Sequence, residues 1–126
     1  MQPPGSARQI VLVVDDEILL RMLAIEILEA EGFDTLEAQH AEEAIGILEK
    51  RSDVHLIFTD VNMPGTMDGL KLAHYVRDRW PPVKILTTSG RNHYLGSELP
   101  EGSNFLPKPY SAAQLGAMMR SMATKA

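Results

Sequence analysis

The sequence predicts a single α/β domain in which helices cover both faces of a five-stranded parallel sheet, with the strand order 2-1-3-4-5. Three observations support this prediction. Short apolar runs typical of strands alternate along the chain with helix-forming stretches of ten residues or more. The first run, Ile10–Val14, is continuously apolar and mostly β-branched, like strands that are buried on both faces of a parallel sheet. The length of 126 residues is that of one ordinary domain.

In the first half of the chain, each predicted strand is followed by a helix-forming stretch. Residues 17–31 are mostly strong helix formers, and Gly32 stands where a helix C-terminal glycine is expected. Residues 33–37 predict a short second strand, and Ala41–Lys50 predicts a second helix with an apolar stripe. Residues 55–59 predict a third strand, which is followed directly by Asp60.

The second half continues the alternation with one irregular segment. A turn-rich loop at residues 62–65 leads to a third helix over residues 68–80, which ends before two prolines. Residues 83–88 and 104–106 predict the fourth and fifth strands, and Ser111 caps a last helix that reaches Ala123. Residues 91–103 contain two glycines and one proline, so we expect a short or irregular fourth helix there. The whole pattern predicts a flavodoxin-like topology.

Composition excludes several classes of protein. The chain has no cysteine, which excludes disulfides, cysteine-ligated zinc and iron–sulfur clusters. A net charge of -5 argues against direct binding to nucleic acid. No apolar run is long enough to cross a membrane, and residues 1–8, which predict a flexible arm, lack the apolar stretch of a signal peptide. We therefore expect a cytoplasmic protein, not bound to membranes, in which residues 9–126 form one domain.

Acidic residues follow two of the predicted strands. Asp15 and Asp16 come directly after the first strand, and Asp60 follows the third. Binding sites in open parallel sheets form beyond the carboxyl ends of the strands where the strand order reverses, which here is between these two strands. Three carboxylates that meet there repel one another unless a cation joins them. Because the candidate ligands are all oxygens, the pattern favours Mg²⁺.

Two more polar side chains are expected at the same edge of the sheet. Ser89 follows the fourth strand and Lys108 follows the fifth, although a strand register shifted by one residue would place Thr88 there instead of Ser89. A carboxylate can attack phosphorus and form an aspartyl phosphate, and Mg²⁺ with a lysine would neutralise the charge of the phosphoryl group. The residues therefore suit phosphoryl transfer.

Four motifs together resemble the receiver domain of bacterial two-component response regulators. They are Val14-Asp15-Asp16-Glu17, the loop that runs from Thr59 to Gly65, Ser89-Gly90, and Lys108-Pro109-Tyr110. The resemblance runs from about Gln9 to Ala123. It implies that Asp60 is the phosphoacceptor, that Asp16 and Asp60 bind Mg²⁺ through carboxylates and Asn62 through its backbone carbonyl, and that Asp15 acts through a metal-bound water.

The resemblance also implies a conformational switch. Ser89 and Lys108 would each contact an oxygen of the phosphoryl group, and the Lys108–Pro109 peptide would be cis. Phe105 matches the aromatic switch residue of the family. Two features depart from the family pattern: Thr66 is an extra residue in the loop after Asp60, and the segment between Ser89 and Lys108 is short.

The first helix has more apolar residues than one sheet can cover. We expect Leu20, Leu23, Ala24 and Ile27 to face the core, which leaves a second row of Ile18, Met22 and Ile25. In the family this helix resembles the docking face for a histidine kinase or a histidine phosphotransfer protein, so we expect Met22 and Ile25 to be partly exposed and to contact that partner. The alternative is that a neighbouring helix or the arm covers them.

We therefore predict a stand-alone receiver that accepts a phosphoryl group on Asp60 from a histidine kinase or phosphotransfer protein in a Mg²⁺-dependent reaction. It would catalyse only its own phosphorylation and dephosphorylation, and signal by binding an unknown downstream protein, with a homodimer as a possibility. One alternative is a phosphatase or phosphotransferase with an aspartyl-phosphate intermediate, but no cap domain is present to close over a substrate. The other is a flavin-binding domain, whose phosphate the acids after the first strand would repel.

Overall fold

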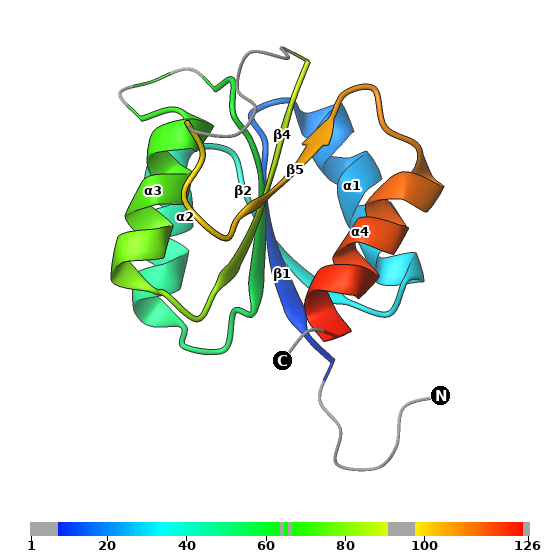
Figure 1. Cartoon of the computed structure of the whole chain (residues 1–126), viewed down its shortest axis with the longest axis horizontal. Helices are drawn as coiled ribbons and strands as arrows, with labels where there is room; N and C mark the ends of the chain where they lie inside the picture. Colours follow the sequence, from blue (N-terminus) through cyan, green and yellow to red (C-terminus); the bar gives the residue numbers. More distant parts are fainter. Residues whose placement is uncertain (1–7, 64, 66, 91–97, 125–126) are drawn as a thin grey trace.

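The computed structural model describes residues 8–63, 65, 67–90 and 98–124. Its five strands are parallel and, numbered along the chain, have the predicted order 2-1-3-4-5, and helices cover both faces of the sheet (Figure 1). Most of the predicted arm, the extra Thr66 and residues 91–97 of the predicted fourth-helix segment lie outside the described residues. Arg8, the last residue of the predicted arm, donates from Nε to the Gly32 carbonyl at 2.8 Å.

The first strand has the predicted bounds, and each of the other four ends one residue later than the sequence predicts. Their bounds are Ile10–Val14 for β1, Asp34–Ala38 for β2, Leu56–Asp60 for β3, Lys84–Ser89 for β4 and Asn104–Pro107 for β5. The predicted second, third and fourth strands begin and end one residue too early, and the predicted fifth strand ends one residue too early. In β3 and β4 the parallel ladder continues into polar residues. Asp60 pairs with Thr88, and Ser89 pairs with Pro107. The polar residues at the carboxyl edge of the sheet are therefore held by the ladder itself.

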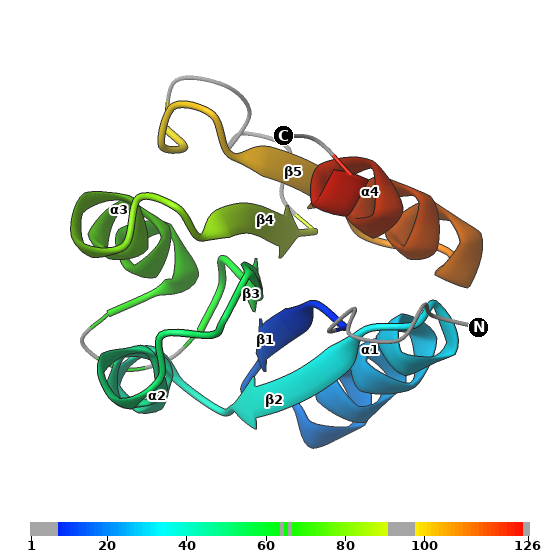
Figure 2. The same cartoon turned by 90° about the horizontal axis from the view of Figure 1, so that it is seen from below.

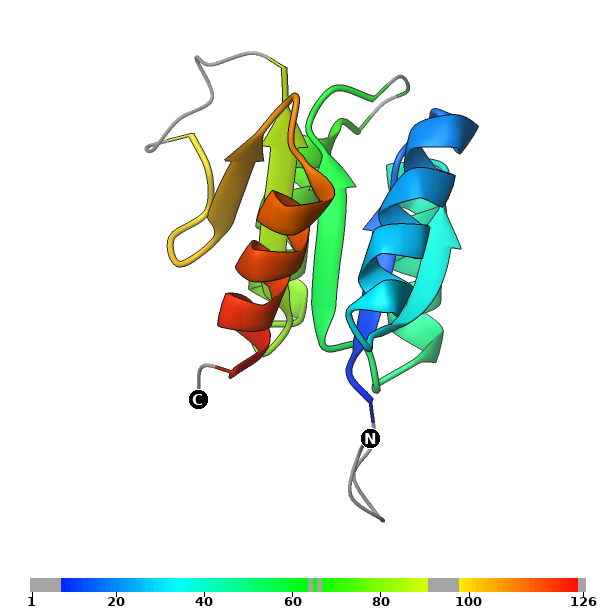
Figure 3. The same cartoon turned by 90° about the vertical axis from the view of Figure 1, so that its right-hand side faces the viewer.

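In the part of the chain that the structure describes, four helices pack in two layers on the sheet. α1 (Ile18–Ala30) and α4 (Ala112–Thr124) cover one face, and α2 (Ala41–Lys50) and α3 (Gly69–Arg79) cover the other (Figures 2 and 3). Gly32 follows α1 with a φ of 99°, the left-handed conformation that a helix-ending glycine adopts at no steric cost. Among the described residues, none of the helices has the length and apolar character needed to cross a membrane.

The core lies on both faces of the sheet, since successive strand residues point to opposite sides. On β1, Leu12 and Val14 pack toward α2 and α3, whereas Val11 and Val13 pack toward α1 and α4. All four are at most 1% exposed. This double burial explains why the central strands read as unbroken apolar runs.

The predicted core row of α1 is partly wrong. Ala24 is buried as expected, but Leu23 is 50% exposed, and Leu20 and Ile27 are only half-buried. The buried row consists instead of Arg21, Ala24 and Leu28, which shows that the helix is rotated relative to the prediction. Arg21, which the predicted core row did not include, faces the sheet, where its guanidinium donates hydrogen bonds to the Asp15 carbonyl and to Glu37.

The exposed side of α1 is correspondingly more apolar than predicted. Ile18 and Met22 are 58% and 56% exposed, and Leu19, which the prediction did not single out, is 77% exposed. Ile25 is half-buried and packs against the core beneath α1. We call Ile18, Leu19, Met22 and Leu23 the apolar face of α1.

Gly69 begins α3 in direct contact with the end of β3. Its amide donates to the Val61 carbonyl at 2.9 Å, and a Cβ at this position would overlap the Asp60 carbonyl and lie 2.7 Å from the Val61 Cα. Backbone atoms cannot move aside as a flexible side chain can. Glycine is therefore required here by space, and the start of α3 is held against the peptide that carries Asp60.

We expect Gly69→Ala to lower the free energy of unfolding by about 3 kcal/mol, because the new methyl group meets backbone. The matched control is Gly46→Ala in α2, where a Cβ meets no atom within 4 Å. That control should raise stability by about 0.5–1 kcal/mol through helix propensity. Urea unfolding followed by circular dichroism measures both. Equal effects of the two substitutions would contradict the close-approach argument.

Candidate functional site

Three carboxylates meet at the carboxyl edge of the sheet. Asp15 and Asp16 follow β1, Asp60 ends β3, and one oxygen from each lies within 4.8 Å of the others. Asp15 and Asp60 are buried, with 7% and 4% of their surface exposed, whereas Asp16 is exposed. The sequence predicted that the strand order would bring these residues together. We call Asp15, Asp16 and Asp60 the carboxylate cluster.

The two buried carboxylates are fixed by local backbone. Oδ1 of Asp15 accepts a hydrogen bond from the Glu17 amide, and Oδ1 of Asp60 accepts one from the Asn62 amide, each at 2.9 Å. Asp and Asn commonly bond to an amide two residues ahead in this way. The Asp15 amide in turn donates to the Ala38 carbonyl at 3.1 Å. Both loops therefore present their carboxylates in defined directions.

Lys108 supplies a positive charge to the cluster. Its Nζ donates to Oδ2 of Asp60 at 2.7 Å, a charge-assisted hydrogen bond between β3 and the loop after β5. The Lys108 amide donates to the Ser89 carbonyl at 3.0 Å, and the Lys108–Pro109 peptide is cis, as the resemblance implied. The ammonium offsets one of three negative charges, which leaves the cluster net negative.

Ser89 and Thr88, the two hydroxyl residues that the sequence offers at this edge, have different partners. The Thr88 hydroxyl donates to the Leu106 carbonyl at 2.7 Å and is directed to β5. The Ser89 hydroxyl donates to Oδ1 of Asn62 at 2.8 Å, in the loop that follows Asp60. Ser89 thus links the end of β4 to that loop, whereas Thr88 is the residue that pairs with Asp60 in the ladder, and the role of Ser89 at the site stays a prediction.

Burial is the main influence on the charge state of Asp15. Desolvation raises the pKa of Asp15 above its usual value, and the nearby Asp60 and Asp16 raise it further, whereas the Glu17 amide and Lys108 lower it. A divalent cation would remove this repulsion. Oxygen ligands from carboxylates and from the Asn62 backbone suit a hard cation such as Mg²⁺, so the residues present fit the predicted metal.

Tyr110 is a residue that the sequence analysis did not single out. It is half-buried, with its ring in edge contact with Phe58 at 5.8 Å between centroids. Burial and the charges of Asp15 and Asp60 raise the pKa of Tyr110 to about 12, so its hydroxyl keeps its proton at neutral pH. The only sequence signal for Tyr110 is its place in the Lys108-Pro109-Tyr110 motif, because apolar periodicity does not indicate that a tyrosine hydroxyl lies near the carboxylate cluster.

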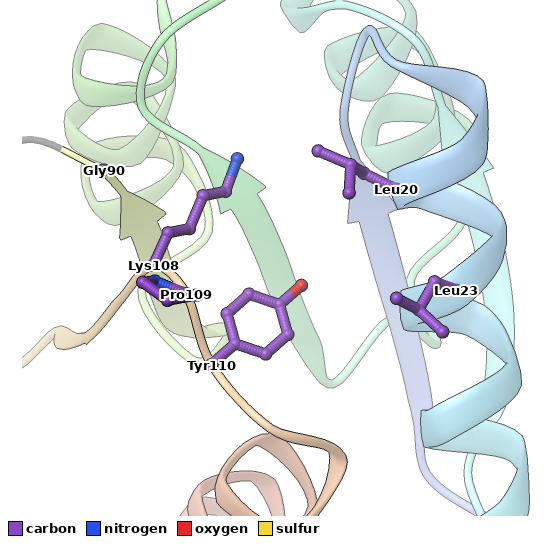
Figure 4. Close-up of a pocket in the computed structure, with 6 residues that line it drawn as sticks. All are labelled: Leu20, Leu23, Gly90, Lys108, Pro109 and Tyr110. Atoms are coloured by element: carbon purple, nitrogen blue, oxygen red, sulfur yellow. The ribbon is translucent and has the colours of Figure 1, made fainter.

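A pocket of about 490 Å³ opens beside Lys108. Figure 4 shows that Leu20 and Leu23 of α1 face Lys108 and Tyr110 across it, and Gly90 and Pro109 complete the lining. The walls are mainly apolar, and the ammonium of Lys108 connects the pocket with Asp60. The pocket therefore lies beside the carboxylate cluster, with Lys108 shared between them.

Phe105 lies on β5 beside Thr87 of β4 and is half-buried. Its neighbour Leu106 packs in the core with α1 and α4, so Phe105 points to the opposite face of the sheet. On that face, α3 contacts the segment before β5, where Nε2 of His74 lies 2.8 Å from the Glu98 carbonyl. The role of Phe105 as a switch stays a prediction.

We expect Asp15→Asn to stabilise the metal-free protein at neutral pH. Because its pKa is raised, Asp15 binds a proton more tightly in the folded state than in the unfolded state. The free energy of unfolding therefore decreases as the pH rises through the folded-state pKa of Asp15. Asparagine can still accept the Glu17 amide but carries no charge. The melting temperature in EDTA at pH 7 should rise by a few degrees, and the difference should shrink toward pH 4.

The control for this prediction is Asp53→Asn. Asp53 is an exposed carboxylate whose pKa is lowered by its hydrogen bonds with Arg51, so its neutralisation should not stabilise the protein. A melting temperature that falls in Asp15→Asn at pH 7, or rises equally in both variants, would contradict the argument. Mg²⁺ should raise the melting temperature of the wild type and of Asp53→Asn, but not that of Asp15→Asn.

Comparison with known proteins agrees with this geometry. Residues 11–120 match the family described as "Response regulator receiver domain". The sensor kinase CckA of Brucella abortus (strain 2308) is 35% identical over 125 residues, which cover 96% of this chain and 13% of CckA. The aerobic respiration control protein ArcA of Escherichia coli (strain K12) is 31% identical over 119 residues, 91% of this chain and 48% of ArcA. The chain thus spans less than half the length of these relatives.

Solved structures similar to this one are also response regulators. A CheY-like receiver domain from Methylobacillus flagellatus has a TM-score of 0.81 and 28% identity, covering 92% of this chain and 99% of that one. The response regulator TrrA from Thermotoga maritima, solved in complex with Mg²⁺-BeF, has a TM-score of 0.80 and 26% identity, covering 90% and 98%. With the family match spanning most of the chain, and the carboxylate cluster and Lys108 in place, this protein belongs to the response regulator receiver domain family.

Proposed function

We propose that Asp60 accepts a phosphoryl group from a phosphohistidine of a histidine kinase or phosphotransfer protein, in a Mg²⁺-dependent reaction. The observation that carries this proposal is the 2.7 Å contact between Lys108 Nζ and Oδ2 of Asp60 inside a cluster of three carboxylates. Asp60 is the carboxylate that both an ammonium and a backbone amide hold in place. Membership of the receiver family leaves the phosphatase and flavin-binding alternatives without support.

The reaction follows from the placement of these groups. A side-chain oxygen of Asp60 forms a bond to phosphorus while the bond between phosphorus and the donor's imidazole nitrogen breaks, and the nitrogen keeps the electron pair. Lys108 balances the negative charge that gathers on the phosphoryl oxygens. Asp15, Asp16, Asp60 and the Asn62 carbonyl would hold Mg²⁺, which neutralises the remaining charge and aligns the phosphoryl group. The Mg²⁺-BeF complex of TrrA supports this assignment.

Phosphorylation would act on the rest of the domain through Ser89. Its hydroxyl, which donates to Asn62, would turn to a phosphoryl oxygen and release the loop after Asp60. Phe105 lies on the strand beside β4 and would change position in response. The altered surface would bind a downstream protein, or a second copy of the chain. In this proposal the protein is a cytoplasmic receiver that catalyses only its own phosphorylation and dephosphorylation.

The apolar face of α1 supports a docking role. Ile18, Leu19, Met22 and Leu23 are each at least half exposed, and Leu23 also lines the pocket beside Lys108. A helix of a phosphohistidine donor that packs on this face would have the pocket, and through it Asp60, within reach of its side chains. Ile25, the third residue of the predicted docking row, is half-buried and would contribute less than Met22.

We expect acetyl phosphate with Mg²⁺ to add one phosphoryl group to the wild-type protein and none to Asp60→Asn. The intact mass measured by mass spectrometry checks this, with an EDTA arm in which the wild type should also gain nothing. Asp53→Asn is the matched control and should be phosphorylated normally, because Asp53 pairs with Arg51 away from the cluster. Incorporation that persists in Asp60→Asn would overturn the assignment of the phosphoacceptor.

We expect Met22→Lys and Leu19→Lys to slow transfer from a phosphohistidine donor at least tenfold, because a charge would be placed in an apolar contact. Phosphorylation by acetyl phosphate, which needs no docking, should keep its rate. Ala30→Lys adds the same charge at the far end of α1 and controls for electrostatics. The rate of phosphoryl loss from the donor, followed on gels, measures the effect. Equal slowing with both phosphodonors would contradict a docking role.

A further inference from the structure

Arg21 is a charged residue in a buried position. It lies on the side of α1 that packs on the sheet and is 9% exposed, where the neighbouring turns of the helix place Ala24 and Leu28. A buried guanidinium is costly unless its donors are satisfied. Arg21 has no part in the proposed phosphorylation chemistry. Its two polar partners therefore have to explain why an arginine is buried at this position.

The first partner is the backbone at the start of the carboxylate cluster. Nη1 of Arg21 donates to the carbonyl oxygen of Asp15 at 2.7 Å in a buried hydrogen bond. This oxygen belongs to the peptide that joins Asp15 to Asp16. Because a peptide unit is planar, holding its carbonyl also fixes the direction in which the chain enters Asp16. Asp16 is exposed, so its carboxylate depends on backbone to stay beside Asp15 and Asp60.

The second partner holds the guanidinium itself. Nε of Arg21 donates to Oε1 of Glu37 on β2 at 2.7 Å, an ion pair at the edge of a cavity of about 170 Å³ that Glu43 also lines. The carboxylate of Glu37 offsets a positive charge that would otherwise repel a cation at the cluster. Arg21 thus connects α1, the end of β1 and β2 at one point.

We propose that Arg21 is a positioning residue for metal binding: by holding the Asp15 carbonyl, it directs Asp16 toward Asp15 and Asp60. The proposal rests on the proposed Mg²⁺ site. Simple electrostatics and positioning make opposite predictions for this residue. Removal of a positive charge near the cluster would strengthen cation binding if charge alone mattered. Loss of the hydrogen bond to Asp15 would weaken it, as the loss of groups that orient metal ligands does.

The test is the Mg²⁺ affinity of Arg21→Met, measured by isothermal titration calorimetry at pH 7. Methionine keeps an apolar stem but loses both hydrogen bonds, so the dissociation constant should rise about tenfold or more. Arg21→Lys keeps the charge but, with a single ammonium in place of the guanidinium fork, cannot hold both acceptors in the same way, and should bind several-fold more weakly than the wild type. Arg51→Met, which breaks an exposed pair with Asp53, is the matched control and should bind like the wild type.

The measurements distinguish a positioning role of Arg21 from a merely structural role and from the absence of a metal site. Unchanged or tighter Mg²⁺ binding in Arg21→Met overturns the positioning role, and if that variant does not fold, unchanged binding in Arg21→Lys does so. A wild type that binds no Mg²⁺ overturns the metal site itself and with it this proposal. Melting temperatures in EDTA distinguish a merely structural role, because such a role would lower stability in Arg21→Met while leaving the Mg²⁺ affinity of the folded protein unchanged.

Discussion

Asp15 and Asp60 place two nearly buried negative charges beside a third, Asp16, and their mutual repulsion has to be offset by the surrounding fold. Backbone amides two residues ahead bind one oxygen of each buried carboxylate, and Lys108 binds the other oxygen of Asp60. These contacts fix three loops at the carboxyl edge of the sheet. The compensation is incomplete, because Lys108 brings one positive charge against three carboxylates, and a bound cation would offset the remaining negative charge.

Helix α1 serves both the buried site and the exposed surface. Its inward side carries Arg21, which donates hydrogen bonds to the Asp15 carbonyl and to Glu37 and so connects the end of β1 with β2. Because an arginine takes this buried position, apolar residues such as Leu19 and Leu23 are turned outward. One orientation of α1 therefore both brings Arg21 to the Asp15 carbonyl and leaves the apolar face of α1 exposed.

The topology could be predicted from the sequence because the unbroken apolar run of β1 and the alternation with helices leave few arrangements. The carboxylate cluster and Lys108 followed from their places after strands. The predicted ends of β2, β3, β4 and β5 are each one residue short. In β3 and β4 the reason is that Asp60 and Ser89 lie in the ladder although apolar periodicity stops before them. Arg21 and Tyr110 were missed because a pattern of apolar spacing carries no information on which polar atoms meet in space.

In the proposed switch, the hydrogen bond from Ser89 to Asn62 would limit the free energy that phosphorylation makes available for the conformational change. A hydroxyl that exchanges a neutral amide oxygen for a charged phosphoryl oxygen loses one bond as it gains another, so the net gain is the difference between a neutral and a charged bond, about 1 kcal/mol. That difference corresponds to a population change of only about fivefold. Ser89 alone would thus bias two nearly balanced conformations rather than drive one to completion, which keeps the transition reversible and leaves binding partners room to shift it.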